Sequence, residues 1–198
     1  MRRPHITGHQ AHERKSVLVG VVPLSDPLDA WLECAALLDL DDLVIMGDSL
    51  VRRKAPFTTL AQLRAAASGY RSRRGARTVA QAIPLIRANT DSARETVLRL
   101  VLARAGFPEP EVNGIVENSL GQPIAHGDLV FREYRTIVEY EGDHHRTDER
   151  QFNIDIDRFD ELAEEGWRAI RVSKALLRRR ATLLGRVDSA LRAGGWRH

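Results

Sequence analysis

The stretch from Ile124 to His145, IAHGDLVFREYRTIVEYEGDHH, most constrains what this chain can fold into. It reads as two short strands joined by a turn and followed by a loop that carries histidines. Side chains two residues apart on a strand share a face, so Glu139 and Glu141 lie on one face of the second strand. Asp128 lies near the end of the first strand, which we expect to pair with the second. Burying carboxylates without a partner is costly, and a hard divalent cation such as Mg²⁺ or Mn²⁺ would supply one.

Composition limits the class of protein. The 198 residues suffice for one domain of ordinary size, or for a small domain with an appendage. No apolar run approaches the roughly 20 residues that span a bilayer, and no apolar stretch follows the charged N-terminus, so neither a membrane span nor a secretory signal is expected. Cys34 is the single cysteine, which excludes an internal disulfide and favours a reducing, cytoplasmic location. Most basic residues are arginines, which suit contact with a polyanion.

Residues 1–88 are expected to form a small, mainly helical region with a basic loop, YRSRRGAR, at 70–77. The elements that the pattern predicts are a strand at Val17–Val22, a helix that Asp26 and Pro27 start and Asp41 and Asp42 close, a helix from Thr58 through Ala67, and a helix from Thr78 to about Ala88 kinked by Pro84. His5, His9 and His12 have helical spacing, but Gly8 disfavours a helix there, so an arm is preferred to a metal site. The basic loop either contacts DNA phosphates or is a solvated face.

Residues 89–198 are expected to form a second domain. The predicted elements are an amphipathic helix capped by Asp91 or Ser92, strands at Val112–Val116, Ile124–Phe131 and Arg135–Glu141, a helix from about Arg150 to Glu165, a strand at Trp167–Val172, and a last helix capped by Ser173. Short connections predict an antiparallel meander of the first three strands. The strand, helix, strand succession then predicts a right-handed crossover to a parallel fourth strand. The fold class is therefore α/β (α+β) with a mixed sheet.

Four segments carry a resemblance to a known family: SARE at 92–95, GDLVF at 127–131, VEYEGDHH at 138–145 and DIDRFDELAEEGWRAIRVS at 155–173. Together they resemble the PD-(D/E)XK phosphodiesterase superfamily, and more closely the bacterial domains related to very-short-patch-repair endonucleases. The resemblance covers residues 89–198 and implies a restriction-endonuclease-like αβββαβα core. The upstream segments PLSDPLDAWLE and VIMGDSLVRR look like the middle of longer actinobacterial-type proteins, some of them described as resembling abortive-infection antitoxins.

The resemblance implies a set of metal ligands. Asp128 would be the acid of the first half-motif and Glu139 the acid of the second, and both would bind Mg²⁺ or Mn²⁺. Tyr140 matches the position whose backbone carbonyl is often a further ligand in the superfamily. Glu95 matches the glutamate of the first helix that commonly completes the site. Bound there, a cation would polarise the scissile phosphate and lower the pKa of an attacking water.

The sequence departs from the family pattern at Glu141, which stands in place of the usual lysine. Relatives of the repair endonucleases also lack that lysine, and His145 is the candidate general base or acid in its place, ahead of His144. The cysteines of the repair enzymes' structural zinc site are absent. Asp157 and Arg158 are expected to form a structural ion pair rather than to act in catalysis.

Each site residue also has a purely structural interpretation. Ser92 and Glu95 have the spacing of a helix capping box. Asp128 could bond the backbone at a strand end, Glu141 could sit at the solvated end of its strand, and His145 could be a solvated loop residue. These alternatives stay open at the level of sequence.

Three functions are consistent with these features. The first is a metal-dependent endonuclease or nickase acting on duplex DNA, with a homodimer as one way to cut both strands. The second is a nucleic-acid-binding or regulatory protein on a nuclease scaffold that no longer cleaves, such as a toxin–antitoxin or abortive-infection component. The third is a protein-interaction module with a structural acidic cluster, because a fold alone does not determine function.

Overall fold

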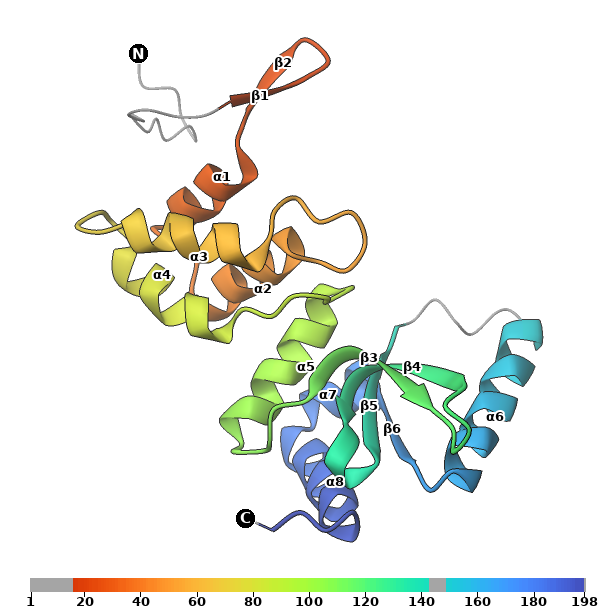
Figure 1. Cartoon of the computed structure of the whole chain (residues 1–198). Coiled ribbons are helices and arrows are strands. Elements are labelled where there is room, and N and C mark those ends of the chain that lie inside the picture. Colours follow the sequence, from red (N-terminus) through yellow and green to blue (C-terminus); the bar gives the residue numbers. More distant parts are fainter. Residues whose placement is uncertain (1–15, 143–148, 198) are drawn as a thin grey trace.

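The computed structural model describes residues 16–142 and 149–197, with the side chains of 149–156 excepted. A group of short helices precedes a four-stranded mixed sheet that has helices on both faces (Figure 1). The expected mixed α/β class is therefore confirmed, whereas the restriction-endonuclease-like topology stays a prediction. Within the described ranges, no helix is long and apolar enough to cross a membrane.

The described chain begins with a hairpin that projects away from the helices, formed by β1 (Ser16–Val19) and β2 (Val22–Ser25) (Figure 1). The prediction of one continuous strand at 17–22 is wrong, because the chain turns after Val19. Gly20 has a φ of +64°, a conformation that glycine adopts without steric cost.

Four α-helices and a short 3₁₀ helix complete this region: α1 (Pro27–Cys34), α2 (Leu40–Leu50), α3 (Leu60–Gly69), α4 (Ala76–Ala82) and η1 (Ile83–Leu85). The prediction that Asp41 and Asp42 close the first helix is wrong, because α1 ends earlier and both residues lie in the first turn of α2. Asp39 caps α2, its carboxylate accepting a hydrogen bond from the Asp42 N–H at 2.9 Å. Carboxylates at a helix N-terminus are favoured by the helix dipole, so a cluster of aspartates marks a helix start here.

The helix predicted from Thr58 through Ala67 is confirmed as α3, whereas the helix predicted from Thr78 to about Ala88 is shorter than predicted, because its α-helical part ends at Ala82. Thr59 caps α3 in a capping box with Gln62, and Pro84 lies in η1, where the α-helical part of the third predicted helix has ended. The core of this region forms around Trp31, which is fully buried and donates its indole N–H to the Leu43 carbonyl at 2.9 Å.

The elements that follow are α5 (Ala93–Arg104), β3 (Glu111–Glu117), β4 (Pro123–Phe131), η2 (Arg132–Tyr134), β5 (Thr136–Glu141), α6 (Glu149–Glu164), β6 (Arg168–Ser173), α7 (Lys174–Arg178) and α8 (Arg180–Ala193). The strand order is β3-β4-β5-β6, with the first three strands antiparallel and β6 parallel to β5. The predicted meander and parallel fourth strand are confirmed. The last helix, predicted as one, is divided into two at Arg179.

The two faces of the sheet are covered by different helices. Leu162 of α6 packs on one face with Val130 and Ile137. Residues of α5, α7 and α8 pack on the other face with Leu129 and Val138. Because alternate residues of β4 and β5 point to opposite faces, both strands are apolar on both sides except toward the ends where the acidic residues lie.

Helix α5 belongs to two cores at once. Leu98 packs with the sheet, whereas Leu100 packs with the helices of the N-terminal region. Asp48 of α2 and Arg99 of α5, exposed by only 1% and 2%, form a buried salt bridge of 2.7 Å. The helical region is therefore tied to the helix that lies against the sheet.

Candidate metal and nucleic-acid site

The two predicted metal-binding acids lie on adjacent antiparallel strands. Leu129 of β4 pairs with Val138 of β5, and Asp128 and Glu139 each lie one residue beyond this last pair of the β4–β5 ladder. Gly127 lets the strands approach here, because a Cβ at this position would lie 2.5 Å from the Ile137 Cγ2 atom. The sequence therefore places both carboxylates at the end of a tightly packed strand pair.

Asp128 is a partly buried acid in an unfavourable environment. Its Oδ2 atom accepts a hydrogen bond from the Tyr140 backbone N–H at 2.7 Å. Burial, and then the negative charge of Glu95, raise the pKa of Asp128 from 3.8 to about 7, and Glu139 contributes in the same direction. The structure thus brings Asp128 within electrostatic range of the two other predicted acidic ligands, and a large part of Asp128 is protonated at neutral pH.

Glu95 acts as part of the helix start. Ser92 caps α5 by accepting a hydrogen bond from the Glu95 N–H at 3.2 Å. The Glu95 Oε2 atom accepts bonds from the Asp91 N–H at 2.9 Å and from the Asn113 side-chain amide at 2.8 Å. Glu95 therefore has the capping role that its spacing predicted, except that its carboxylate accepts the N–H of Asp91 and not that of the cap residue Ser92. Its charge also acts on Asp128.

Glu139 is held by an arginine from α6. The two guanidinium nitrogens of Arg158 donate to the two carboxylate oxygens at 3.0 and 3.1 Å, the bidentate geometry that gives the strongest pairs. The Arg158 guanidinium also lies over the ring of Phe159, 4.7 Å from its centroid. Arg158, for which the sequence suggested Asp157 as the partner, is thus part of the acidic site.

Glu141, two residues further along β5, forms an ion pair with Arg171 of β6. About a third of its side chain is exposed, as expected for the solvated end of a strand. Tyr140 contributes its N–H to Asp128, and the proposed ligand role of its carbonyl stays a prediction. His144 and His145 lie outside the described residues, so the general base or acid role of His145 also stays a prediction.

A second polar group lies beside the acids and was missed by sequence reasoning. Arg53, from the segment after α2, forms an ion pair with Asp91 and donates to the Nε2 atom of His126 at 3.0 Å. Because a guanidinium is only a donor, the Nε2 atom accepts and the ring carries its proton on Nδ1. Burial, and then the charge of Arg53, lower the pKa of His126. His126 is therefore a neutral ring whose lone pair is already engaged.

One signal in the sequence could have identified His126. It lies two residues before Asp128 on β4, so the two-residue period of a strand places both side chains on one face. Arg53 has no such signal, because its contact with the site depends on how the N-terminal helices pack against α5.

The carboxylates of Glu95, Asp128 and Glu139 are of the type that binds hard cations, but their oxygens already accept hydrogen bonds from other groups of the protein. Among the described side chains, those of residues 16–142 and 157–197, no three of the His, Cys, Asp and Glu types are grouped closely enough to hold an ion. Both Glu139 oxygens contact Arg158, and the Glu95 Oε2 atom accepts two N–H groups. Carboxylate oxygens fit Mg²⁺ or Mn²⁺, and Glu139 would have to exchange Arg158 for the ion.

Comparison with protein-family models, curated proteins and solved structures finds no match to this chain. The resemblance to the PD-(D/E)XK superfamily therefore rests on the motif residues of the sequence.

Proposed function

We propose that the chain is a Mg²⁺- or Mn²⁺-dependent DNA endonuclease. The observation that carries the proposal is the placement of Asp128, a partly buried carboxyl whose pKa is raised to about 7 by burial and by neighbouring acids. Keeping like charges together at a strand end costs stability, and such strained electrostatics are typical of functional sites. A bound divalent cation would neutralise the repulsion between these carboxylates, and this relief would contribute to the affinity for the ion.

Each residue has a role in this proposal. Asp128 and Glu139 would hold the ion, with Glu95 and the Tyr140 carbonyl as further ligands. When bound, the ion would polarise the scissile phosphate and supply a water of lowered pKa. The Tyr140 N–H orients Asp128, and Arg53, at the rim of the acidic cluster, would contact a phosphate of the DNA. The lone pair of His126 is occupied by Arg53, so the proton would pass to His145 or Glu141.

Nicking of supercoiled plasmid tests the proposal. The wild type should nick the plasmid with Mg²⁺ or Mn²⁺ and not with EDTA, whereas Asp128→Asn and Glu139→Gln should both be inactive. Asp160→Asn is the matched control, because Asp160 is an exposed acid on α6, and it should cut like the wild type. Cleavage that survives both site substitutions would refute the assignment.

A second function is favoured by the ion pair of Glu139 and Arg158. A bidentate arginine on one of the two central acids supplies from within the protein the positive charge that a metal would bring. Such an arrangement suits a protein that binds nucleic acid on a nuclease scaffold without cleaving it, for instance as a toxin–antitoxin or abortive-infection component.

Metal binding separates the two functions. For a nuclease, calorimetric titration with Mn²⁺ should show binding to the wild type that Asp128→Asn abolishes, and Arg158→Gln should bind Mn²⁺ more tightly because the competing cation is gone. For the non-cleaving protein, Mn²⁺ should not bind the wild type, while DNA should still be retarded in a low-salt gel. Absence of both metal and DNA binding would favour the protein-interaction module. Light scattering of the same sample tests whether the chain forms a homodimer.

A further inference from the structure

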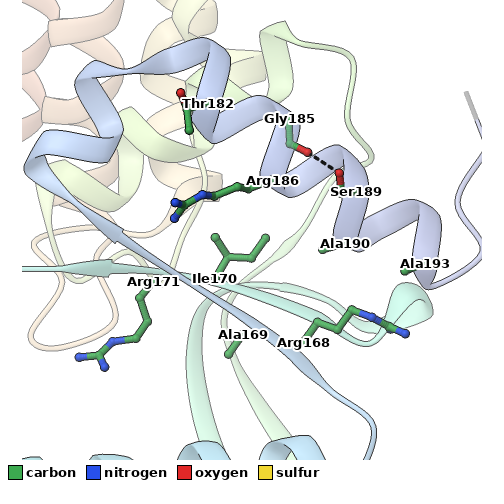
Figure 2. Close-up of a pocket in the computed structure, with 10 residues that line it drawn as sticks. All are labelled: Arg168, Ala169, Ile170, Arg171, Thr182, Gly185, Arg186, Ser189, Ala190 and Ala193. Carbon is green, nitrogen blue, oxygen red and sulfur yellow. Dashed lines mark hydrogen bonds between the residues drawn. The ribbon is translucent and has the colours of Figure 1, made fainter.

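The edge of the sheet at β6 is open. Among the described strands, β6 has a neighbour only in β5, because it is the last strand in the order β3-β4-β5-β6. An edge strand presents backbone groups that can pair with another chain. What distinguishes this edge is a groove of about 790 Å³ that runs between β6 and α8 (Figure 2).

The register decides which backbone groups of β6 face the groove. The Arg168 N–H donates to the Arg135 carbonyl at 2.8 Å, so Arg168 directs its backbone groups toward β5. In a parallel ladder, alternate residues bond to the same neighbour, and the pairing of β5 with β6 is regular along its length. The N–H and C=O groups of Ala169 and Arg171 therefore point away from β5 toward the open edge, and both residues line the groove.

Helix α8 leaves room beside this edge. Its groove-lining residues recur at helical spacing on one face and are mostly small: Thr182, Gly185, Arg186, Ser189, Ala190 and Ala193. A further strand would lie about 4.8 Å from β6, and small side chains on α8 permit its approach. The close-up shows Arg186 and Ile170 on the side of the groove between the helix and the strand (Figure 2).

The charge of the groove is positive. Arg168 and Arg186 supply this charge, and no acidic residue is among the lining residues. The side chain of Arg171 lies instead over the ring of Phe159 of α6, 5.1 Å from its centroid. Arg171 also contacts Glu141, so it links the groove to the predicted site. Guanidinium groups form their best hydrogen bonds with carboxylates and phosphates, and the occupant is therefore an anion.

We propose that this groove binds an acidic, extended segment of another protein, which adds to the sheet as a strand beside β6. The outward C=O groups of Ala169 and Arg171 require donors, and a peptide supplies N–H and C=O groups in alternation. A phosphate backbone supplies acceptors alone and would face these carbonyls unfavourably. A second copy of β6 is disfavoured as well, because it would bring its own Arg168 beside a groove that is already basic.

Fluorescence anisotropy with a labelled hexapeptide of alternating glutamate and valine tests the proposal. The full chain should bind it, and a peptide with the same side chains but with every backbone nitrogen methylated should bind about tenfold more weakly or worse, because it has no N–H donor for either edge of the strand. The methylated peptide leaves the protein unchanged, so this comparison does not depend on how a variant folds.

Charge reversal gives an independent comparison. Arg186→Glu, an exposed groove residue, should weaken peptide binding by about tenfold or more. Arg180→Glu, which lies on the same helix outside the groove-lining residues, is the matched control and should bind like the wild type. Equal binding of the methylated peptide, equal loss in both variants, or absence of binding at millimolar peptide would overturn the proposal. Displacement of the peptide by a short DNA duplex, in the wild type and in Arg180→Glu alike, would point to a nucleic-acid surface instead and would also overturn it.

Discussion

Replacing Asp128 by asparagine should stabilise the metal-free protein while abolishing its proposed activity. The pKa of Asp128 is raised from 3.8 to about 7, and each pKa unit corresponds to about 1.4 kcal/mol. Ionising Asp128 in the folded chain at pH 8 therefore costs up to about 4 kcal/mol relative to the unfolded chain, and we expect about 2–4 kcal/mol because the side chain retains some solvent contact. Asparagine carries no charge and can still accept the Tyr140 N–H.

The difference in stability between Asp128→Asn and the wild type should depend on pH. A carboxyl whose folded pKa is raised contributes stability at pH values below its unfolded pKa, and this contribution is lost as the pH rises through 7. Asp128→Asn should therefore exceed the wild type in stability by most at pH 8 and by less than half as much at pH 5. In melting temperature the gain at pH 8 should be about 5–15 °C for a chain of this size.

Urea unfolding in EDTA at pH 5, 6, 7 and 8 provides the measurement, with Asp160→Asn as the control that should show no such trend. Adding Mg²⁺ at pH 8 should stabilise the wild type and leave Asp128→Asn unchanged. If Asp128→Asn is less stable than the wild type at pH 8, or if its advantage is equal at pH 5 and pH 8, the electrostatic account of this site is refuted.

Four further substitutions test how the fold is held together, each by urea unfolding at pH 7. Asp48→Ala should cost about 3–5 kcal/mol because it leaves Arg99 buried without its carboxylate, whereas Asp41→Ala, in an exposed ion pair on the same helix, should change stability by less than about 1 kcal/mol. Gly127→Ala should cost about 1–3 kcal/mol, since its Cβ would lie 2.5 Å from a methyl group of Ile137. Gly185→Ala should add about 0.5–1 kcal/mol, because a Cβ there meets nothing within 4 Å and alanine favours the helix. Stabilisation by Gly127→Ala, or destabilisation by Gly185→Ala, would contradict the packing argument.

The order of elements in the second half of the chain followed from local patterns. Alternating apolar residues, short connections and caps such as Ser92 and Ser173 act over a few residues, so the sequence predicts them well. The errors arose where one residue changes the path of the chain. Gly20 turned an apolar run into a hairpin, and aspartates at the start of α2 were interpreted as the end of the helix before it.

The candidate site was predictable only in part. The two-residue period and the hairpin placed Asp128 beside Glu139, because both effects are local to neighbouring strands. The arginines that contact the acids come from far along the chain, Arg158 from α6 and Arg53 from the N-terminal region. Such contacts depend on tertiary packing, which no local pattern encodes.

Helix α5 is buried on more sides than its sequence pattern predicts. The sequence predicted a helix with one apolar side, yet Thr96 and Arg99 on its other side are also buried because they bond to Asp48. The middle turns of α5 are therefore covered by the core around the sheet and by the core of the N-terminal helices. Water can reach their backbone only if one of these cores opens. The amide protons of α5 should be among the last in the chain to exchange with deuterium. Glu95 lies in the first turn of this helix and is buried, so we expect a ligand to meet its carboxylate already in place.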